Sequence, residues 1–122
     1  MPVRPRESGP FEGSVESAEL SYWNQGGCGE FAIALQREFP ILGLEGVRPE
    51  ALDGGIGHVW AADSEGRYFD VFGSRSDRPY PGHPIATDLT AEEIAEGLGL
   101  AISEAAVAEA QEIVRRMFGR GS

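Results

Sequence analysis

The chain has 122 residues, of which 41% are hydrophobic and 25% are charged, and its formal net charge at pH 7 is −10. This size and composition are typical of one globular domain, and the acidic balance argues against a nucleic-acid partner, since phosphate backbones are bound by clusters of Lys and Arg. No run of about 18 apolar residues occurs, so we expect no membrane-spanning helix.

The first part of the chain is poor in apolar residues. Residues 1–13 contain three Pro and two Gly, which predicts a flexible N-terminal arm ahead of a single domain over residues 14–122. The arm leads into no apolar run, which argues against a secretory signal and favours the cytoplasm. Cys28 is the single cysteine, so no internal disulfide can form, as is usual for a chain in a reducing compartment.

Helical patterns come first along the domain. Residues 14–22 are compatible with a short helix, and the Gly pair at 26–27 indicates a loop. Residues 28–39 have the apolar spacing of an amphipathic helix that Pro40 ends. The apolar residues that recur every four positions in it are Phe31, Leu35 and Phe39.

Strand patterns follow. We expect one strand near residues 42–47, a second over residues 58–62 and a third over residues 67–72 that Gly73 closes, with residues 74–84 as a surface loop. The second and third strands flank residues 63–66, which suit a hairpin with a three-residue loop and a left-handed Gly66.

The C-terminal third reads as two helices, so the predicted fold class is α+β. Thr90 and Glu93 form a capping-box pattern that starts a short helix ending near Gly97. Ser103 caps a longer helix that runs to about Phe118 and ends at Gly119. The apolar residues of that longer helix are Val107, Ala110, Ile113, Val114 and Met117.

The predicted hairpin brings two functional residues together. If the loop consists of residues 64–66, Trp60 faces Asp70 and His58 faces Phe72, and alternation places these side chains and Tyr68 on one face of the hairpin. His58 and Asp70 are then diagonal neighbours within reach of each other. Asp70 could fix the tautomer of the imidazole and stabilise its charged form.

Cys28 would stand in the first turn of the predicted helix. Unpaired N–H groups and the positive end of the helix dipole favour a thiolate there, and the same N–H groups could hold an oxyanion. Cys28, His58 and Asp70 therefore have the residue types of a nucleophile, a general base and an orienting carboxylate.

Three segments carry a resemblance to a known family. Gly27-Cys28-Gly29-Glu30-Phe31, Gly57-His58-Val59-Trp60 and the segment over residues 68–73 resemble the papain-like superfamily, and its transglutaminase-like branch most closely. The resemblance implies a small core in which the nucleophile helix packs on an antiparallel sheet, with a helical C-terminus. It also implies that Cys28 is the nucleophile, His58 the base and Asp70 the orienting residue. We expect no cofactor.

The string around the nucleophile departs from the papain pattern. Asn24-Gln25-Gly26-Gly27-Cys28-Gly29 is similar to the papain active-site string, but the papain nucleophile would fall at Phe31, so we align on Cys28. Asn24 and Gln25 are then candidates to line the oxyanion or substrate site. Trp60 and Trp23 are candidates to wall it, with core packing as the alternative.

The expected function is thiol-dependent hydrolysis or acyl transfer on an amide, peptide or thioester. The substrate would be a protein, a peptide or a small amide. Two alternatives stay open. Cys28, His58 and Asp70 could bind zinc, although paired Cys or His spacing is absent. The chain could also be a non-catalytic binding or accessory protein that keeps the scaffold and docks a partner through its C-terminal helices.

Overall fold

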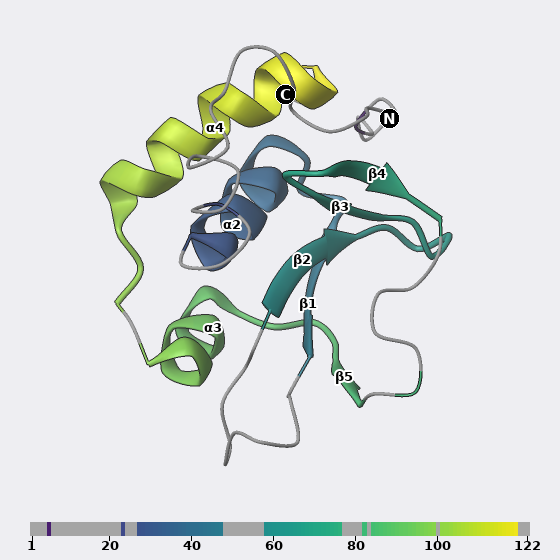
Figure 1. Ribbon diagram of the computed structural model, residues 1–122, viewed down its shortest axis with the longest axis vertical. Coiled ribbons are helices and arrows are strands. Elements are labelled where there is room, and N and C mark those ends of the chain that lie inside the picture. Colours follow the sequence, from purple (N-terminus) through teal and green to yellow (C-terminus); the bar gives the residue numbers. More distant parts are fainter. Residues whose placement is uncertain are drawn as a thin grey trace.

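The computed structural model describes Pro5, Trp23, residues 27–47, residues 58–76, Gly82, residues 84–99 and residues 101–119. These residues form three helices and a five-stranded antiparallel sheet, so the structure is α+β as predicted (Figure 1). The helices are α2 (Cys28–Glu38), α3 (Ala91–Leu98) and α4 (Glu104–Phe118). The strands are β1 (Gly43–Val47), β2 (His58–Ala62), β3 (Tyr68–Asp70), β4 (Gly73–Arg75) and β5 (Ile85–Ala86).

Two predictions for the N-terminal part of the chain lie outside the residues that the structure describes. The arm over residues 1–13 lies outside the described residues except for Pro5, which is buried. The short helix expected over residues 14–22 lies wholly outside them.

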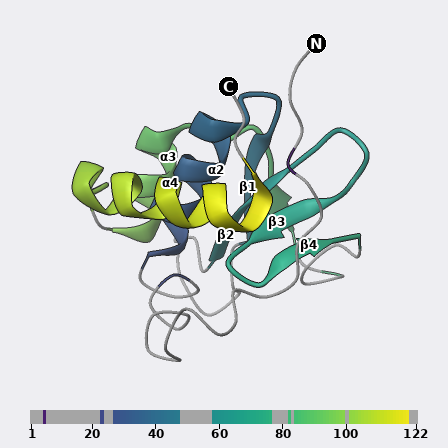
Figure 2. The ribbon, with the colours of Figure 1, turned by 90° about the horizontal axis from the view of Figure 1, so that it is seen from above.

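The elements form layers around α2. The sheet has the strand order β4-β3-β2-β1-β5, with each neighbouring pair antiparallel. Helix α2 packs on the central strands, and α4 crosses over the side of α2 that faces away from the sheet (Figures 1 and 2). None of the helices that the structure describes has the length and apolar character that a membrane span requires.

Helix α2 forms the centre of the core. Its apolar residues Phe31, Leu35 and Phe39 are buried, as their fourfold spacing predicts. Burying a side chain of this size contributes about 1.5–3 kcal/mol. The helix ends at Glu38, because Pro40 two residues later has no N–H to continue it.

The hairpin of β2 and β3 has the predicted register. Ala61 pairs with Phe69, and the N–H of Asp63 donates to the carbonyl of Arg67 at 2.9 Å. Gly66 has a φ of 87°, which glycine adopts without the strain of a Cβ. The side chain of Asp63 accepts the N–H groups of Glu65 and Arg67, each at 2.9 Å, and so stabilises the turn.

The third strand is shorter than the sequence pattern suggested. Strand β3 ends at Asp70, and a tight turn at Val71 and Phe72 leads directly into β4, in which Gly73 pairs with Asp70. Phe72 therefore leaves the predicted face and packs against the core on the helix side of the sheet. Gly73 begins a strand rather than closing one, so the predicted surface loop is wrong at its start.

The sequence pattern did not predict the strand that follows this loop. Strand β5 follows the loop at Ile85 and Ala86 and pairs with Gly46 and Val47 of β1. At two residues it is too short to give a periodic signal.

The two C-terminal helices begin where their caps predicted. The hydroxyl of Thr90 accepts the N–H of Glu93 at 3.1 Å, and the Glu93 side chain accepts the N–H of Thr90 at 3.2 Å. The hydroxyl of Ser103 accepts the N–H of Ala106 at 3.2 Å. The residues that α4 buries are Ala106, Val107, Ala110, Val114, Met117 and Phe118.

Candidate functional site

Three side chains that are distant in sequence lie together at one end of the sheet. Cys28 is the first residue of α2, His58 is the first of β2 and Asp70 is the last of β3. The distance from His58 Nε2 to Asp70 Oδ2 is 3.9 Å, which is an ion-pair separation rather than a hydrogen-bond length. Cys28 is near enough to influence the titration of the imidazole.

The surroundings of His58 favour its protonated form. Burial lowers the pKa of His58, but the neighbouring Asp70 and Cys28 side chains outweigh it and raise the pKa from 6.5 to about 9. An imidazole with that pKa is protonated at neutral pH.

The turn after β3 fixes the orientation of Asp70. Its Oδ1 accepts the N–H of Phe72 at 2.8 Å, which closes an Asx-type turn over Val71. The other oxygen, Oδ2, is the one that faces His58. The short β3 that ends at Asp70 is thus what aims this carboxylate at the imidazole.

Residues of α3 and of the segment before α4 contact the first turn of α2, which carries Cys28. A Cβ built on Gly29 would lie 2.9 Å from Leu98 Cδ1 and 3.0 Å from Ile94 Cγ2, so α3 packs as closely as glycine allows. The Glu30 carboxylate accepts the N–H of Ser103 at 3.4 Å, just ahead of α4. The C-terminal helices therefore buttress the first turn of α2.

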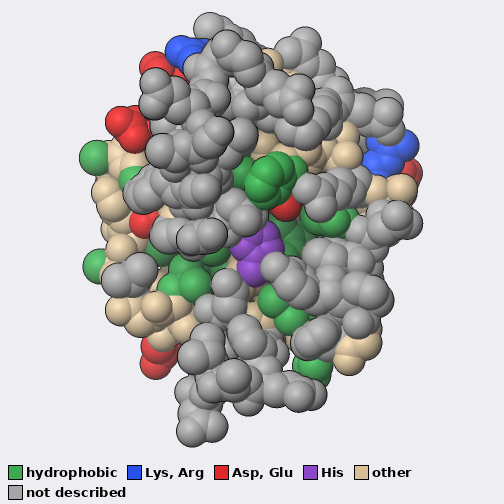
Figure 3. Space-filling view, viewed as in Figure 1, with side chains coloured by type: hydrophobic (Ala, Val, Ile, Leu, Met, Phe, Trp, Pro, Cys, Tyr) green, Lys and Arg blue, Asp and Glu red, His purple; other side chains and the backbone are tan. Residues whose placement is uncertain are grey.

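The three side chains differ little in burial. Cys28 is 2% exposed, Asp70 is 7% exposed and His58 is 8% exposed. Figure 3 shows the side chain of the described histidine, His58, at the surface of the face seen in Figure 1, with hydrophobic side chains nearby. Because all three side chains are buried, a substrate group needs local opening to reach the sulfur.

The two tryptophans predicted to wall the site are buried. Trp60 is 1% exposed, and its ring lies 5.8 Å from that of His58, centroid to centroid, with a tilt of 34°. Trp23 belongs to the hydrophobic core and packs on Phe31. Both tryptophans are therefore packed in the interior, which was the alternative to walling a cleft. Asn24 and Gln25 lie outside the described residues.

One neighbour of the site was not anticipated from the sequence. Glu45 of β1 stands opposite Trp60 in the strand register, and its Oε1 accepts the indole N–H at 3.1 Å. No sequence signal marks this contact, because Glu45 alternates with the buried Leu44 along the strand and its partner depends on the pairing of β1 with β2. That pairing spans residues 48–57, and no local pattern predicts it.

The grouping needed for a metal ion is not found in the described part of the chain. Within those residues no set of three or more His, Cys, Asp and Glu side chains is arranged to hold one. The zinc alternative from Cys28, His58 and Asp70 therefore gains no support from their geometry.

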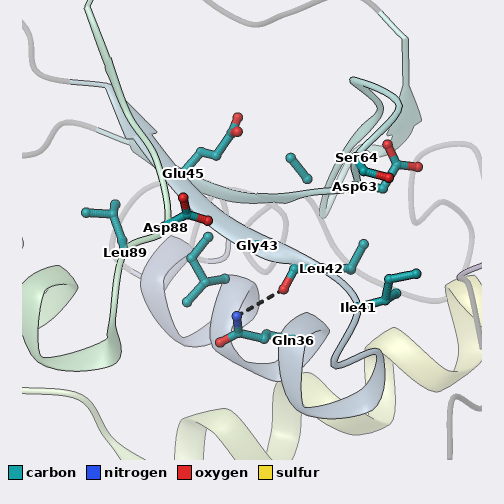
Figure 4. A pocket seen from close by; sticks show the side chains of 11 residues that line it. Gln36, Ile41, Leu42, Gly43, Glu45, Asp63, Ser64, Asp88 and Leu89 are labelled. Carbon is teal, nitrogen blue, oxygen red and sulfur yellow. Dashed lines mark hydrogen bonds between the residues drawn. The ribbon is translucent and has the colours of Figure 1, made fainter. Parts of the chain in front are cut away.

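A separate cavity of about 410 Å³ lies at the other end of α2 (Figure 4). Gln36 from the last turns of α2 lines it and donates to the carbonyl of Leu42 at 3.0 Å. Asp63 and Asp88 line it too, and Asp88 has a φ of 53°. Cys28 is eight residues from Gln36, about 12 Å along the helix, so the cavity is distinct from the cysteine site.

Comparison of the chain with protein-family models, with curated proteins and with solved structures found no match. The functional argument therefore rests on the geometry of this chain.

Proposed function

We propose that this chain is a thiol-dependent hydrolase or acyltransferase of the papain-like, transglutaminase-like kind, acting on an amide, peptide or thioester. The observation that carries the proposal is the meeting of Cys28, His58 and Asp70 from α2, β2 and β3. The order along the chain, the helix-tip cysteine and the strand-borne histidine and aspartate are what the sequence resemblance implies. The raised pKa of His58 adds support, since it is caused by the two proposed partners.

The first half-reaction follows from these positions. His58 already holds the proton of the Cys28 thiol, and the Cys28 thiolate attacks the substrate carbonyl, forming a C–S bond as the carbonyl electron pair moves to oxygen. The first-turn N–H groups of α2 have no intrahelical acceptors, and in this proposal they hold that oxygen. Gly27, the N-cap, supplies no side-chain hydrogen bond that would compete for them. Collapse expels the amine or thiol, which takes the proton from His58.

The second half-reaction regenerates the thiol. Water or an amine gives a proton to His58 and attacks the acyl thioester on Cys28, so the C–S bond breaks and the proton returns to sulfur. Water yields a carboxylic acid and an amine yields a new amide. Asp70 keeps Nε2 of the imidazole directed towards its own Oδ2 throughout.

Acylation by p-nitrophenyl acetate tests the proposal. The chain has one cysteine and no lysine, so an acetyl adduct that hydroxylamine removes identifies Cys28 almost without ambiguity. We expect this adduct by mass spectrometry in the unmodified chain, none in Cys28→Ala, and at least about tenfold slower formation in His58→Gln. His83→Gln, which removes the other histidine, is the matched control and should acylate normally. Equal rates in His58→Gln and His83→Gln would refute the proposal.

One observation favours a second candidate, a binding or accessory protein that keeps the scaffold. Cys28 is 2% exposed, which suits a structural thiol as well as a guarded nucleophile. Such a protein would bind its partner through the outer faces of α3 and α4, because the apolar face of α4 is already buried. Absence of the acetyl adduct from a folded chain would favour this candidate.

A further inference from the structure

Trp60 is the buried aromatic neighbour of the imidazole. Its ring centroid is 5.8 Å from that of His58, and on its other side it meets Tyr68 edge-on at 6.2 Å. At 1% exposure the indole has no room to turn without disturbing its neighbours, which include Val47 and Ala62. The orientation of the indole therefore limits the orientations open to the imidazole beside it.

Glu45 fixes that indole. A buried indole N–H needs an acceptor, and the half-buried Glu45 carboxylate supplies one at 3.1 Å. Because the acceptor is a carboxylate oxygen, this bond is stronger than one between neutral groups and holds the indole in place. The centre of this indole lies 5.8 Å from that of the His58 ring, within the range at which an aromatic ring can stabilise a cation.

We infer that Glu45 is a positioning residue of the cysteine site, acting through Trp60 to hold the His58 ring in the orientation that faces Asp70 and Cys28. The inference rests on the proposed function, because a positioning role for Glu45 requires that His58 act on Cys28. The placement of Glu45 beside Trp60 comes from the strand register. Glu45 and Trp60 are cross-strand partners, and the cross-strand partner of His58 on β1 is the apolar Val47.

Two titratable side chains other than Glu45 act on His58 directly. Asp70 approaches it from β3 and Cys28 from α2, and both act on its titration. Glu45 lies on the same face of the sheet, two residues before Val47, which is the cross-strand partner of His58. Its effect on His58 is therefore expected to depend on the indole that lies between them.

A double-mutant cycle tests the inference. The variants are Glu45→Ala, Trp60→Phe and the double variant, with Glu45→Val as a second choice if Glu45→Ala fails to fold. Glu109→Gln, at an exposed position on α4, makes a similar change in net charge and is the control. The measurements are the rate of Cys28 alkylation by iodoacetamide at pH 6 and the titration of the His58 ring by NMR.

We expect Glu45→Ala to slow alkylation about fivefold and to lower the midpoint of the His58 titration. Trp60→Phe keeps a ring but loses the N–H, and it should have a similar effect. The double variant should match Trp60→Phe alone, because the effect of Glu45 passes through the indole. Glu45→Gln keeps an acceptor oxygen and should restore most of the rate.

Three results would overturn the inference. These are an unchanged His58 titration in Glu45→Ala, equal losses in Glu45→Gln and Glu45→Ala, and additive losses in the double variant. The last two would show a direct charge effect on His58. Failure of the proposed function is distinguishable, since it gives an ordinary thiol in the unmodified chain while the His58 titration still reports on Glu45.

Discussion

Asp70 divides its carboxylate between two partners, with Oδ1 accepting the N–H of Phe72 at 2.8 Å and Oδ2 facing Nε2 of His58 at 3.9 Å. The backbone contact fixes where the carboxylate points, and the ion-pair contact acts on the imidazole. The two roles can be separated, because an amide oxygen can replace the first oxygen but cannot supply the charge of the second.

Asp70→Asn should keep the turn and lose the charge. We expect the midpoint of the His58 titration to fall by about one pH unit or more from its value near 9, because an opposite charge at this distance favours the imidazolium. Asp70→Ala should cause the same fall and also loosen the turn, which lowers the thermal midpoint. NMR of the His58 ring in a His83→Gln background measures the change, and an unaltered titration in Asp70→Asn would contradict the assignment.

The raised pKa of His58 predicts how stability depends on pH. Below its unfolded value of 6.5 the imidazole is protonated in both states, and the stabilisation is fully present. Between 6.5 and about 9 the folded chain keeps a proton that the unfolded chain has lost, so stability falls as pH rises. The contribution lost by pH 9.5 is on the order of 3 kcal/mol.

Urea unfolding at pH 6 and at pH 9.5 measures this loss. The unmodified chain should lose more free energy of unfolding over that interval than His58→Gln, in which the titrating group is absent. His83→Gln is the matched control and should behave as the unmodified chain. Parallel losses in His58→Gln and the unmodified chain would show that His58 has no such role.

Gly29→Ala should destabilise the chain even though alanine favours helix. The new methyl group would lie 2.9 Å from Leu98 and 3.0 Å from the fully buried Ile94. Overpacking of this kind costs about 1–3 kcal/mol, against a gain of about 1 kcal/mol in helix propensity. Denaturant midpoints test the balance, and the cost should shrink in a Leu98→Ala background. A more stable Gly29→Ala would show that α3 yields freely.

The two ion pairs between α2 and α4 should differ in strength. Glu38 has a side chain that is 8% exposed and accepts from Arg115 at 2.8 and 3.1 Å, with a further bond from Gln111 at 2.8 Å. The Arg37 and Glu104 side chains are 43% and 70% exposed. Removing the partner of a buried carboxylate leaves it uncompensated, whereas exposed pairs contribute little.

Arg115→Gln should therefore lower the thermal midpoint by several degrees, and Arg37→Gln should leave it nearly unchanged. Differential scanning calorimetry of both variants makes the comparison. Equal effects would mean that the Glu38 carboxylate is not the anchoring group between these helices.

Local chemistry explains which parts of the fold could be predicted. Gly66 marks its turn because the position requires a left-handed conformation, and Thr90 and Ser103 mark helix starts because their hydroxyls accept first-turn N–H groups. The β2–β3 register follows from the length of the turn, so the closeness of His58 and Asp70 could be anticipated.

Long-range pairing explains most of what could not be predicted. Strand β5 pairs with β1 across nearly forty residues, and the contact of Glu45 with Trp60 depends on a similar non-local register. The end of β3 at Asp70 is a different case. Asp70 begins a turn that leads to Gly73, but the apolar Val71 and Phe72 continue the strand pattern, so the sequence predicted a longer strand.

The most direct test of the central claim is the pH profile of Cys28 alkylation by iodoacetamide, in the unmodified chain and in His58→Gln. Burial of the sulfur lowers the absolute rate of alkylation, but the shape of the pH profile still reports on the thiolate and its partner. A thiolate paired with imidazolium predicts a substantial rate at pH 6 that His58→Gln abolishes. A profile that rises only near the ordinary thiol value of about 8.5, identical in both proteins, would contradict it.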